Sequence, residues 1–123
     1  MPRVIHFELP SSDYPASRSF YESVFGWKFT QFEGPTEYWL VSTGATSEPG
    51  IDGGLGGAAN EFKATVNTVD VDNIDDALKK VLANGGKVVA PKDVIPNMGY
   101  LAYIQEPGGA IVGLFQALPG SRG

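Results

Sequence analysis

The sequence contains no cysteine, and His6 is its only histidine. Disulfides, thiolate nucleophiles, iron–sulfur clusters and cysteine-type zinc sites are therefore excluded, as is any chemistry that needs two imidazoles within one chain. Long hydrophobic runs are also missing, since no apolar stretch approaches the ~20 residues that a membrane-spanning helix needs. The N-terminus lacks the apolar core of a secretion signal, because His6 and Glu8 interrupt it. We therefore expect a cytoplasmic protein with no membrane partner.

Basic residues are few and scattered. Nine Lys and Arg stand against fourteen Asp and Glu, which gives a net charge of −5. Without a basic run, neither nucleic acid nor an anionic membrane surface is expected as a partner. Hydrophobic residues make up 42% and charged residues 19% of the chain, a composition typical of globular proteins. Its length of 123 residues predicts one domain over residues 1–123 with a core of its own.

The two halves of the chain repeat the same order of expected elements. In the first half a strand over 4–9 precedes a helix that starts at the capping cluster 11–13 and stops at Gly26, and strand-like runs follow over 28–33 and 37–43. The second half reads as a strand over 63–71, a helix capped by Asp72 or Asn73 that stops at Gly85, and strands over 87–90, 99–105 and 110–116. Asp13 and Asp72 are 59 positions apart, and so are Gly26 and Gly85. This duplication predicts an α+β fold of two β-α-β-β-β modules paired around a cleft, with module one over about 3–58 and module two over about 59–117.

Apolar residues at helical spacing indicate which helix faces pack on the sheets. The first helix carries Ala16, Phe20 and Val24, and the second carries Ile74, Ala77, Leu78, Val81 and Leu82. Four phenylalanines of the first half are expected in the core: Phe7, Phe20, Phe25 and Phe29. The glycine-rich run over 53–57 fits part of a dinucleotide-loop pattern, but no helix is expected after it, so it is interpreted as a linker between the modules.

Two stretches of sequence resemble a known superfamily. The first is VIHFELPSSDYPASRSFYESVFGWKF, with a histidine on the first strand, an aspartate at the helix start and an FGW ending. The second is VDVDNIDDALKKVLANGGKVVAPKDVIPNMGYLAYIQEPGGAIVGLFQ, in which a turn over 106–110 precedes the last strand. Both resemble the modules of the vicinal oxygen chelate superfamily, which includes glyoxalases, bleomycin resistance proteins and extradiol dioxygenases, and in particular its glyoxalase-related branch. The resemblance covers the chain from about Val4 to Gln116.

The metal enzymes of this superfamily take ligands from the first and last strands of each module, and few of those ligands carry over. His6 matches the first ligand. Its counterpart in the second module is Thr65, or Val66 if Asn73 is the helix cap. The carboxylate expected on the last strand falls on Gly113, and Asp52 is the oxygen ligand available near the end of module one. Two ligands are fewer than the three of an open catalytic zinc site, so neither a bound metal nor another cofactor is expected.

The candidate site residues come from both modules. His6 and Glu8 share one face of their strand, where a neighbouring carboxylate would raise the pKa of His6 and the two could act as a catalytic acid–base pair. The alternative is a hydrogen-bonded histidine left over from a metal site. An aromatic cleft could stack on a flat apolar ligand, and its candidate contacts, together with Asp52, are Trp39, Tyr103 and Phe115. For each aromatic residue the alternative is core packing, and strand parity leaves open whether Trp39 or Tyr38 faces the cleft.

The preferred function is therefore a small-molecule-binding protein of the glyoxalase, bleomycin-resistance and dioxygenase type, which binds a small organic ligand without a tightly bound catalytic metal. The alternative is a glyoxalase-like lyase or dioxygenase-like enzyme that uses His6 with a weakly held divalent metal. A homodimer is expected, because module surfaces of this kind are self-complementary.

Overall fold

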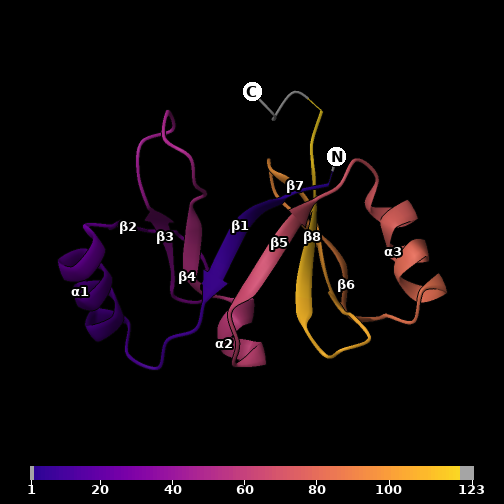
Figure 1. Ribbon diagram of the computed structural model, residues 1–123, viewed down its shortest axis with the longest axis horizontal. Coiled ribbons are helices and arrows are strands. Elements are labelled where there is room, and N and C mark those ends of the chain that lie inside the picture. The colour runs from indigo at the N-terminus through magenta and orange to yellow at the C-terminus, as the bar shows by residue number, and fades with distance from the viewer. Residues whose placement is uncertain (1, 120–123) are drawn as a thin grey trace. The chain divides into compact units, whose positions relative to one another are not determined.

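The computed structural model describes residues 2–119 and divides them into two compact units. The first unit comprises residues 6–66, and the second comprises residues 67–119 together with residues 2–5. The first half of the chain forms β1 (Val4–Leu9), α1 (Tyr14–Phe25), β2 (Lys28–Gln31), β3 (Tyr38–Ser42), β4 (Gly53–Gly56) and the short α2 (Ala58–Phe62). The second half forms β5 (Val66–Asp70), α3 (Ile74–Ala83), β6 (Lys87–Ile95), β7 (Gly99–Gln105) and β8 (Ile111–Ala117) (Figure 1).

Both halves have the same strand topology. The strand order is β2-β3-β4-β1 in the first half and β6-β7-β8-β5 in the second. In each half the first strand runs parallel to the last, β1 with β4 and β5 with β8, while the other pairs are antiparallel. A parallel pair needs a crossover, and the chain between β1 and β4 supplies it with α1 just as the chain between β5 and β8 does with α3. The expected α+β class with two β-α-β-β-β halves is confirmed.

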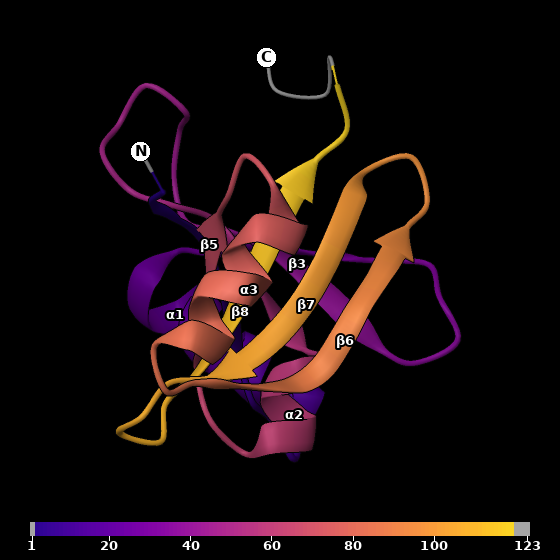
Figure 2. The same ribbon diagram turned by 90° about the vertical axis from the view of Figure 1, so that its right-hand side faces the viewer.

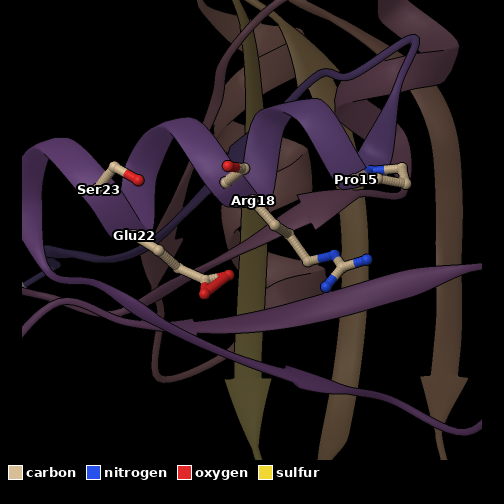
Figure 3. A pocket seen from close by; sticks show the side chains of 5 residues that line it. Pro15, Arg18, Glu22 and Ser23 are labelled. Atoms are coloured by element: carbon tan, nitrogen blue, oxygen red, sulfur yellow. The ribbon is translucent and has the colours of Figure 1, made fainter.

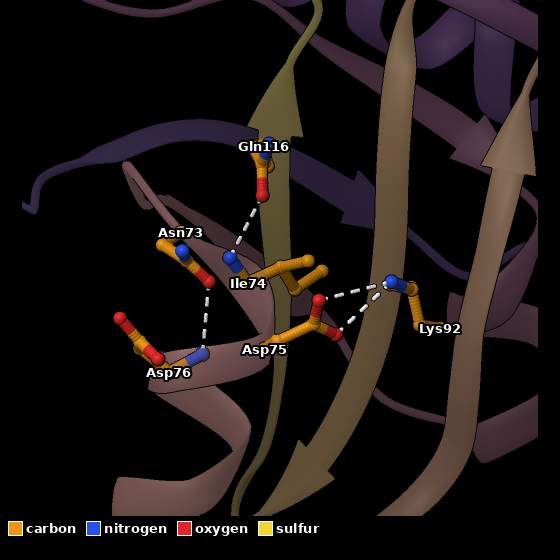
Figure 4. A network of polar contacts seen from close by, with 6 residues as sticks. All are labelled: Asn73, Ile74, Asp75, Asp76, Lys92 and Gln116. Atoms are coloured by element: carbon orange, nitrogen blue, oxygen red, sulfur yellow. Dashed lines mark hydrogen bonds and ion pairs between the residues drawn. The ribbon is translucent and has the colours of Figure 1, made fainter.

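Both longer helices start at a side-chain cap. Asp13 accepts a hydrogen bond from the backbone N–H of Ala16 at 3.1 Å, and the left-handed Gly26 (φ 73°) ends α1. For α3 the cap is Asn73, whose Oδ1 accepts from the backbone N–H of Asp76 at 3.0 Å (Figure 4). Of the two caps that the sequence left open, Asn73 is the observed one and not Asp72, because the extended backbone at Asn73 aims its side-chain oxygen at the first helical turn.

α3 packs on its own sheet as its apolar pattern predicts (Figure 2). Ile74 is almost fully buried, and Ala77, Leu78 and Val81 pack against the same cluster. The buried members of this cluster are Val71, Ile74, Ala102, Ile104 and Leu114. Leu82, the last residue of the expected stripe, is 59% exposed. Two polar contacts tie the helix start to the sheet: Gln116 Oε1 accepts from the Ile74 N–H at 2.9 Å, and Lys92 forms an ion pair with Asp75 at 3.0 Å (Figure 4).

α1 does not pack as its apolar pattern predicts. Phe20, Val24 and Phe25 are 56%, 55% and 57% exposed, so the expected stripe and two of the four expected core phenylalanines lie at the surface. The helix instead packs through Tyr21, whose ring stacks on Trp27 with centroids 5.1 Å apart, and through Arg18. The physical reason is that Arg18 and Tyr21, whose planar side chains lie outside the apolar stripe, make the contacts with the sheet. The helical spacing of apolar residues does not predict such contacts.

The glycine-rich run is a strand and not a linker. Gly53–Gly56 form the central strand β4, buried between β1 and β3. Since Gly53 has no side chain, the ring of Phe7 packs where a Cβ would otherwise sit, 2.5 Å from the ring carbons. The short α2 follows directly, which the sequence also did not predict. None of the helices within residues 2–119 combines the length and apolar character of a membrane-spanning helix.

The cap of α1 can be tested by substitution. We expect Asp13→Ala to lower the free energy of unfolding by about 1 kcal/mol, because it removes the acceptor for the Ala16 N–H. The exposed neighbour Ser12 lies in the same capping cluster, and Ser12→Ala is the matched control, expected to change stability by less than about 0.5 kcal/mol. Urea unfolding measures both. Equal losses for the two variants would contradict the assignment of Asp13 as the cap.

Candidate functional site

The first unit brings polar side chains together on one face of its sheet. Alternation along β1 places His6 and Glu8 on the same face, and Phe7 on the opposite face next to Trp27, with ring centroids 6.0 Å apart. Glu8 is only 7% exposed, one of two buried polar residues in the described part of the chain. A charged or polar group at this depth is retained only where it has partners, and Glu8 has such contacts. This face of the sheet therefore carries the candidate functional side chains of the first unit.

Tyr38 completes this group. Its hydroxyl lies 3.1 Å from His6 Nε2, so the two side chains share a hydrogen bond between β3 and β1. β4 lies between those strands, and the phenol crosses it over Gly54, where an added Cβ would overlap the Tyr38 hydroxyl. At Gly57, which has φ 61°, an added Cβ would lie 2.7 Å from Glu8 Oε2 and 3.0 Å from Tyr38 Cε1. The three side chains converge over these two glycines, and we call them the His6–Glu8–Tyr38 group.

Burial determines the protonation state of His6. Desolvation lowers the pKa of His6 below its ordinary value of 6.5, and the negative charge of Asp52 opposes this only in part. The expected rise in the pKa of His6 is therefore wrong, because the cost of burying an imidazolium outweighs the nearby negative charge. A neutral His6 offers one nitrogen as donor and the other as acceptor near pH 7. The group can thus exchange hydrogen bonds with a carbonyl or hydroxyl group of a ligand.

Trp39 and Asp52 lie apart from this group. Trp39 is on the other face of β3 from Tyr38, where its ring lies under the Arg18 guanidinium at 4.0 Å and its indole N–H donates to Glu37 Oε2 at 2.8 Å. Asp52 is exposed just before β4, and its Oδ1 accepts from the Thr43 backbone N–H at 2.9 Å. Asp52 therefore acts on His6 through its charge, while Trp39 faces α1.

Tyr103 and Phe115 share a sheet face in the second unit. The register pairs Tyr103 with Gly113 and Leu101 with Phe115, and residues paired in this way point to the same side. The opposite side carries the residues that pack with α3, such as Ala102 and Leu114. Tyr103 and Phe115 are half-buried, so this side offers an aromatic surface.

The positions that would hold a metal ion in the superfamily do not fit one here. With Asn73 as the cap of α3, the counterpart of His6 is Val66, which is fully buried and has no donor atom. Gly113 supplies no carboxylate, and an added Cβ there would lie 2.7 Å from Thr68 Oγ1, so neighbouring side chains already fill the position. Within residues 2–119, no three His, Asp or Glu side chains gather as a metal site. We therefore derive no chemistry from a metal ion.

The sequence offered His6 and Glu8 as candidate site residues, and it left open whether Tyr38 or Trp39 lies on their side of the sheet. The pattern over 37–43 fixed only that Tyr38 and Trp39 point to opposite faces of their strand. The available signal was the glycine pair at 53 and 54, because glycines in a strand leave room for a large residue of the next strand to reach across it. Recognising that signal required knowing that the glycines form a strand between β1 and β3.

The fold matches solved structures over nearly its whole length. A crystal structure of the hypothetical protein BH1468 from Bacillus halodurans has a TM-score of 0.74 and 10% identity, with 99% of each chain covered. A Streptomyces coelicolor methylmalonyl-CoA epimerase in complex with 2-nitronate-propionyl-CoA has a TM-score of 0.69 and 13% identity, with 95% of each chain covered. At these identities the likeness concerns the fold alone.

Sequence comparison identifies the family. Residues 3–114 match the model of the Glyoxalase/Bleomycin resistance protein/Dioxygenase superfamily, and this chain belongs to that superfamily. The chain is also 32% identical over 114 residues to the protein named "Putative glyoxylase CFP32" of Mycobacterium bovis and Mycobacterium tuberculosis. That alignment covers 89% of this chain and 44% of the mycobacterial protein, so the chain spans less than half the length of this relative.

The single histidine makes its pKa directly measurable. We expect NMR titration of the His6 imidazole to give a pKa below 6.5, because burial disfavours the charged ring. Asp52→Asn is expected to lower the pKa further, since it removes the charge that opposes the shift. A histidine with a lowered pKa binds fewer protons when folded than when unfolded. The free energy of unfolding should therefore rise with pH from the folded pKa to about 6.5, and His6→Gln should lack this component. A pKa at or above 6.5 would contradict the burial argument.

Proposed function

We propose that this protein binds a small organic molecule without a resident metal ion, and that the His6–Glu8–Tyr38 group is its polar anchor. The observation that supports this most is the hydrogen bond of 3.1 Å between His6 and Tyr38, which crosses β4 over Gly54. A few convergent polar groups beside apolar surface are what ligand sites use to orient a small molecule. The ligand class that suits a neutral imidazole and a phenol carries a hydroxyl or carbonyl group.

The second unit adds a separate surface to the proposal. Tyr103 and Phe115 form a half-buried aromatic face, and we propose that it makes apolar contacts with a ligand. Trp39, the third aromatic residue expected at the site, is engaged with Arg18 and Glu37 on the face toward α1, so we give it no part in the anchor. The homodimer and the cytoplasmic location stay predictions from the sequence.

A second candidate function is proton transfer, favoured by the lowered pKa of His6. A neutral imidazole next to a phenol can accept a proton from an activated C–H bond of a carbonyl compound. The similarity to a protein named as a glyoxylase adds support for an enzyme. Deuterium exchange from solvent into a bound ligand distinguishes the two functions: exchange that is lost in His6→Gln supports catalysis, and binding without exchange supports the binding function.

Ligand binding can be tested with a matched pair of tyrosine variants. A panel of phenols and small hydroxy- and keto-acids is screened by thermal shift, where a ligand at 100 times its dissociation constant stabilises by about 2.7 kcal/mol. We expect Tyr38→Phe to weaken binding of any hit about tenfold, because it removes one hydrogen-bonding hydroxyl. Tyr100→Phe, on β7, is the control and should bind normally. Equal affinity for wild type and Tyr38→Phe would contradict the proposed anchor.

The absence of a resident metal is tested separately. Protein purified without a histidine tag should contain far less than one equivalent of zinc, nickel, iron or manganese. The reason is that Val66 and Gly113 occupy two of the ligand positions and have no side-chain atom that can bind a metal. Adding EDTA should leave the ligand-induced thermal shift unchanged. Elemental analysis that finds about one equivalent of metal, lost in His6→Ala, would overturn the metal-free proposal and favour the metal-dependent enzyme.

A further inference from the structure

A second set of polar groups lies on the opposite face of the first unit's sheet, next to α1. Arg18 reaches from the helix to Trp39, with its guanidinium carbon 4.0 Å from the centroid of the indole ring. Trp39 is itself held by a hydrogen bond of 2.8 Å from its indole N–H to Glu37. Stacking occupies the flat face of the guanidinium and restrains its orientation, but it uses none of the N–H donors, which lie in the plane.

One donor of Arg18, its Nε–H, has no acceptor among the described residues. The Nε atom is buried. No carboxylate within residues 2–119 forms an ion pair with it; the ion pair found there joins Lys92 to Asp75. A buried N–H group without an acceptor is unfavourable, and an anionic acceptor is the partner that a guanidinium binds most strongly.

A small pocket lies beside this side chain. Its volume is about 260 Å³, and its lining comes from one side of α1: Pro15, Arg18, Ser19, Glu22 and Ser23 (Figure 3). Figure 3 shows Arg18 and Glu22 leaving the helix on the same side, one turn apart. The two serine hydroxyls are further hydrogen-bonding groups, whereas the Glu22 carboxylate repels excess negative charge. The pocket is smaller than the 300–1,000 Å³ typical of drug-sized ligands, which suits a small molecule.

We propose that Arg18 and this pocket bind the carboxylate of a small monoanionic organic acid. The planar fork of a guanidinium matches the two oxygens of a carboxylate, and Trp39 holds that fork in place. Glu22 makes the pocket unfavourable for a dianion such as inorganic phosphate. The site lies on the face of β3 opposite to Tyr38, so it is independent of the His6–Glu8–Tyr38 group and of the function proposed for it.

The test uses benzoate as the probe and, in ¹⁵N NMR spectra of the full chain, the backbone N–H resonance of the pocket residue Ser19 as the readout, because wild type and every variant below retain it. We expect a saturable shift of that resonance with benzoate, and weaker binding of inorganic phosphate. Arg18→Lys keeps the positive charge but removes the planar guanidinium that can bind both oxygens of a carboxylate. This variant should weaken benzoate binding by at least about tenfold. Arg3→Lys is the control and should bind as wild type does.

Glu22→Gln provides a second variant that leaves the stack of Arg18 on Trp39 untouched. It should tighten binding of both anions, and of phosphate more than of benzoate, because it removes the repelling charge. A shift that stays linear with benzoate concentration would overturn the proposal. So would unchanged benzoate binding in Arg18→Lys, or a Glu22→Gln variant whose preference between the two anions equals that of wild type.

Discussion

The glycines of β4, a strand in which Leu55 is the one residue with a side chain, are the constraint on which the first half of the molecule depends. β4 lies between β1 and β3, and large residues of both neighbours pack where Gly53 and Gly54 lack side chains. Phe7 uses the space at Gly53 on one face, and Tyr38 uses the space at Gly54 on the other. One structural feature therefore allows both the aromatic packing toward α1 and the polar group around His6. A Cβ at either glycine would force these neighbours to move.

The polar group owes its character to the same packing. The His6 ring is hydrogen-bonded to Tyr38, and desolvation by burial lowers its pKa more than the charge of Asp52 raises it. The superfamily can use a histidine at this position as a metal ligand, but here the partner positions are apolar or empty of side chain, as at Val66 and Gly113. The partner that the structure gives to the His6 ring is the hydroxyl of Tyr38, at 3.1 Å.

The two halves share a topology but differ in how their helices pack. α3 buries an apolar stripe around Ile74, so its contact with the sheet is a hydrophobic core of the usual kind. α1 contacts its sheet through Tyr21 and Arg18, while Phe20 and Phe25 stay exposed. A duplicated fold thus keeps its strand pairing while the chemistry at the helix–sheet contact changes, and in the first half this places a cation against an indole ring.

The sequence by itself determined the class and the order of elements, because helix caps, stop glycines and strand alternation are local signals that the folded chain obeys. It also placed His6 and Glu8 on one face, since alternation along a strand needs no tertiary information. Tertiary structure alone decided that Gly53–Gly56 form a central strand and that Tyr38 and not Trp39 joins His6. These outcomes depend on which strands become neighbours and on how much water they exclude, and both are properties of contacts between residues far apart in the chain.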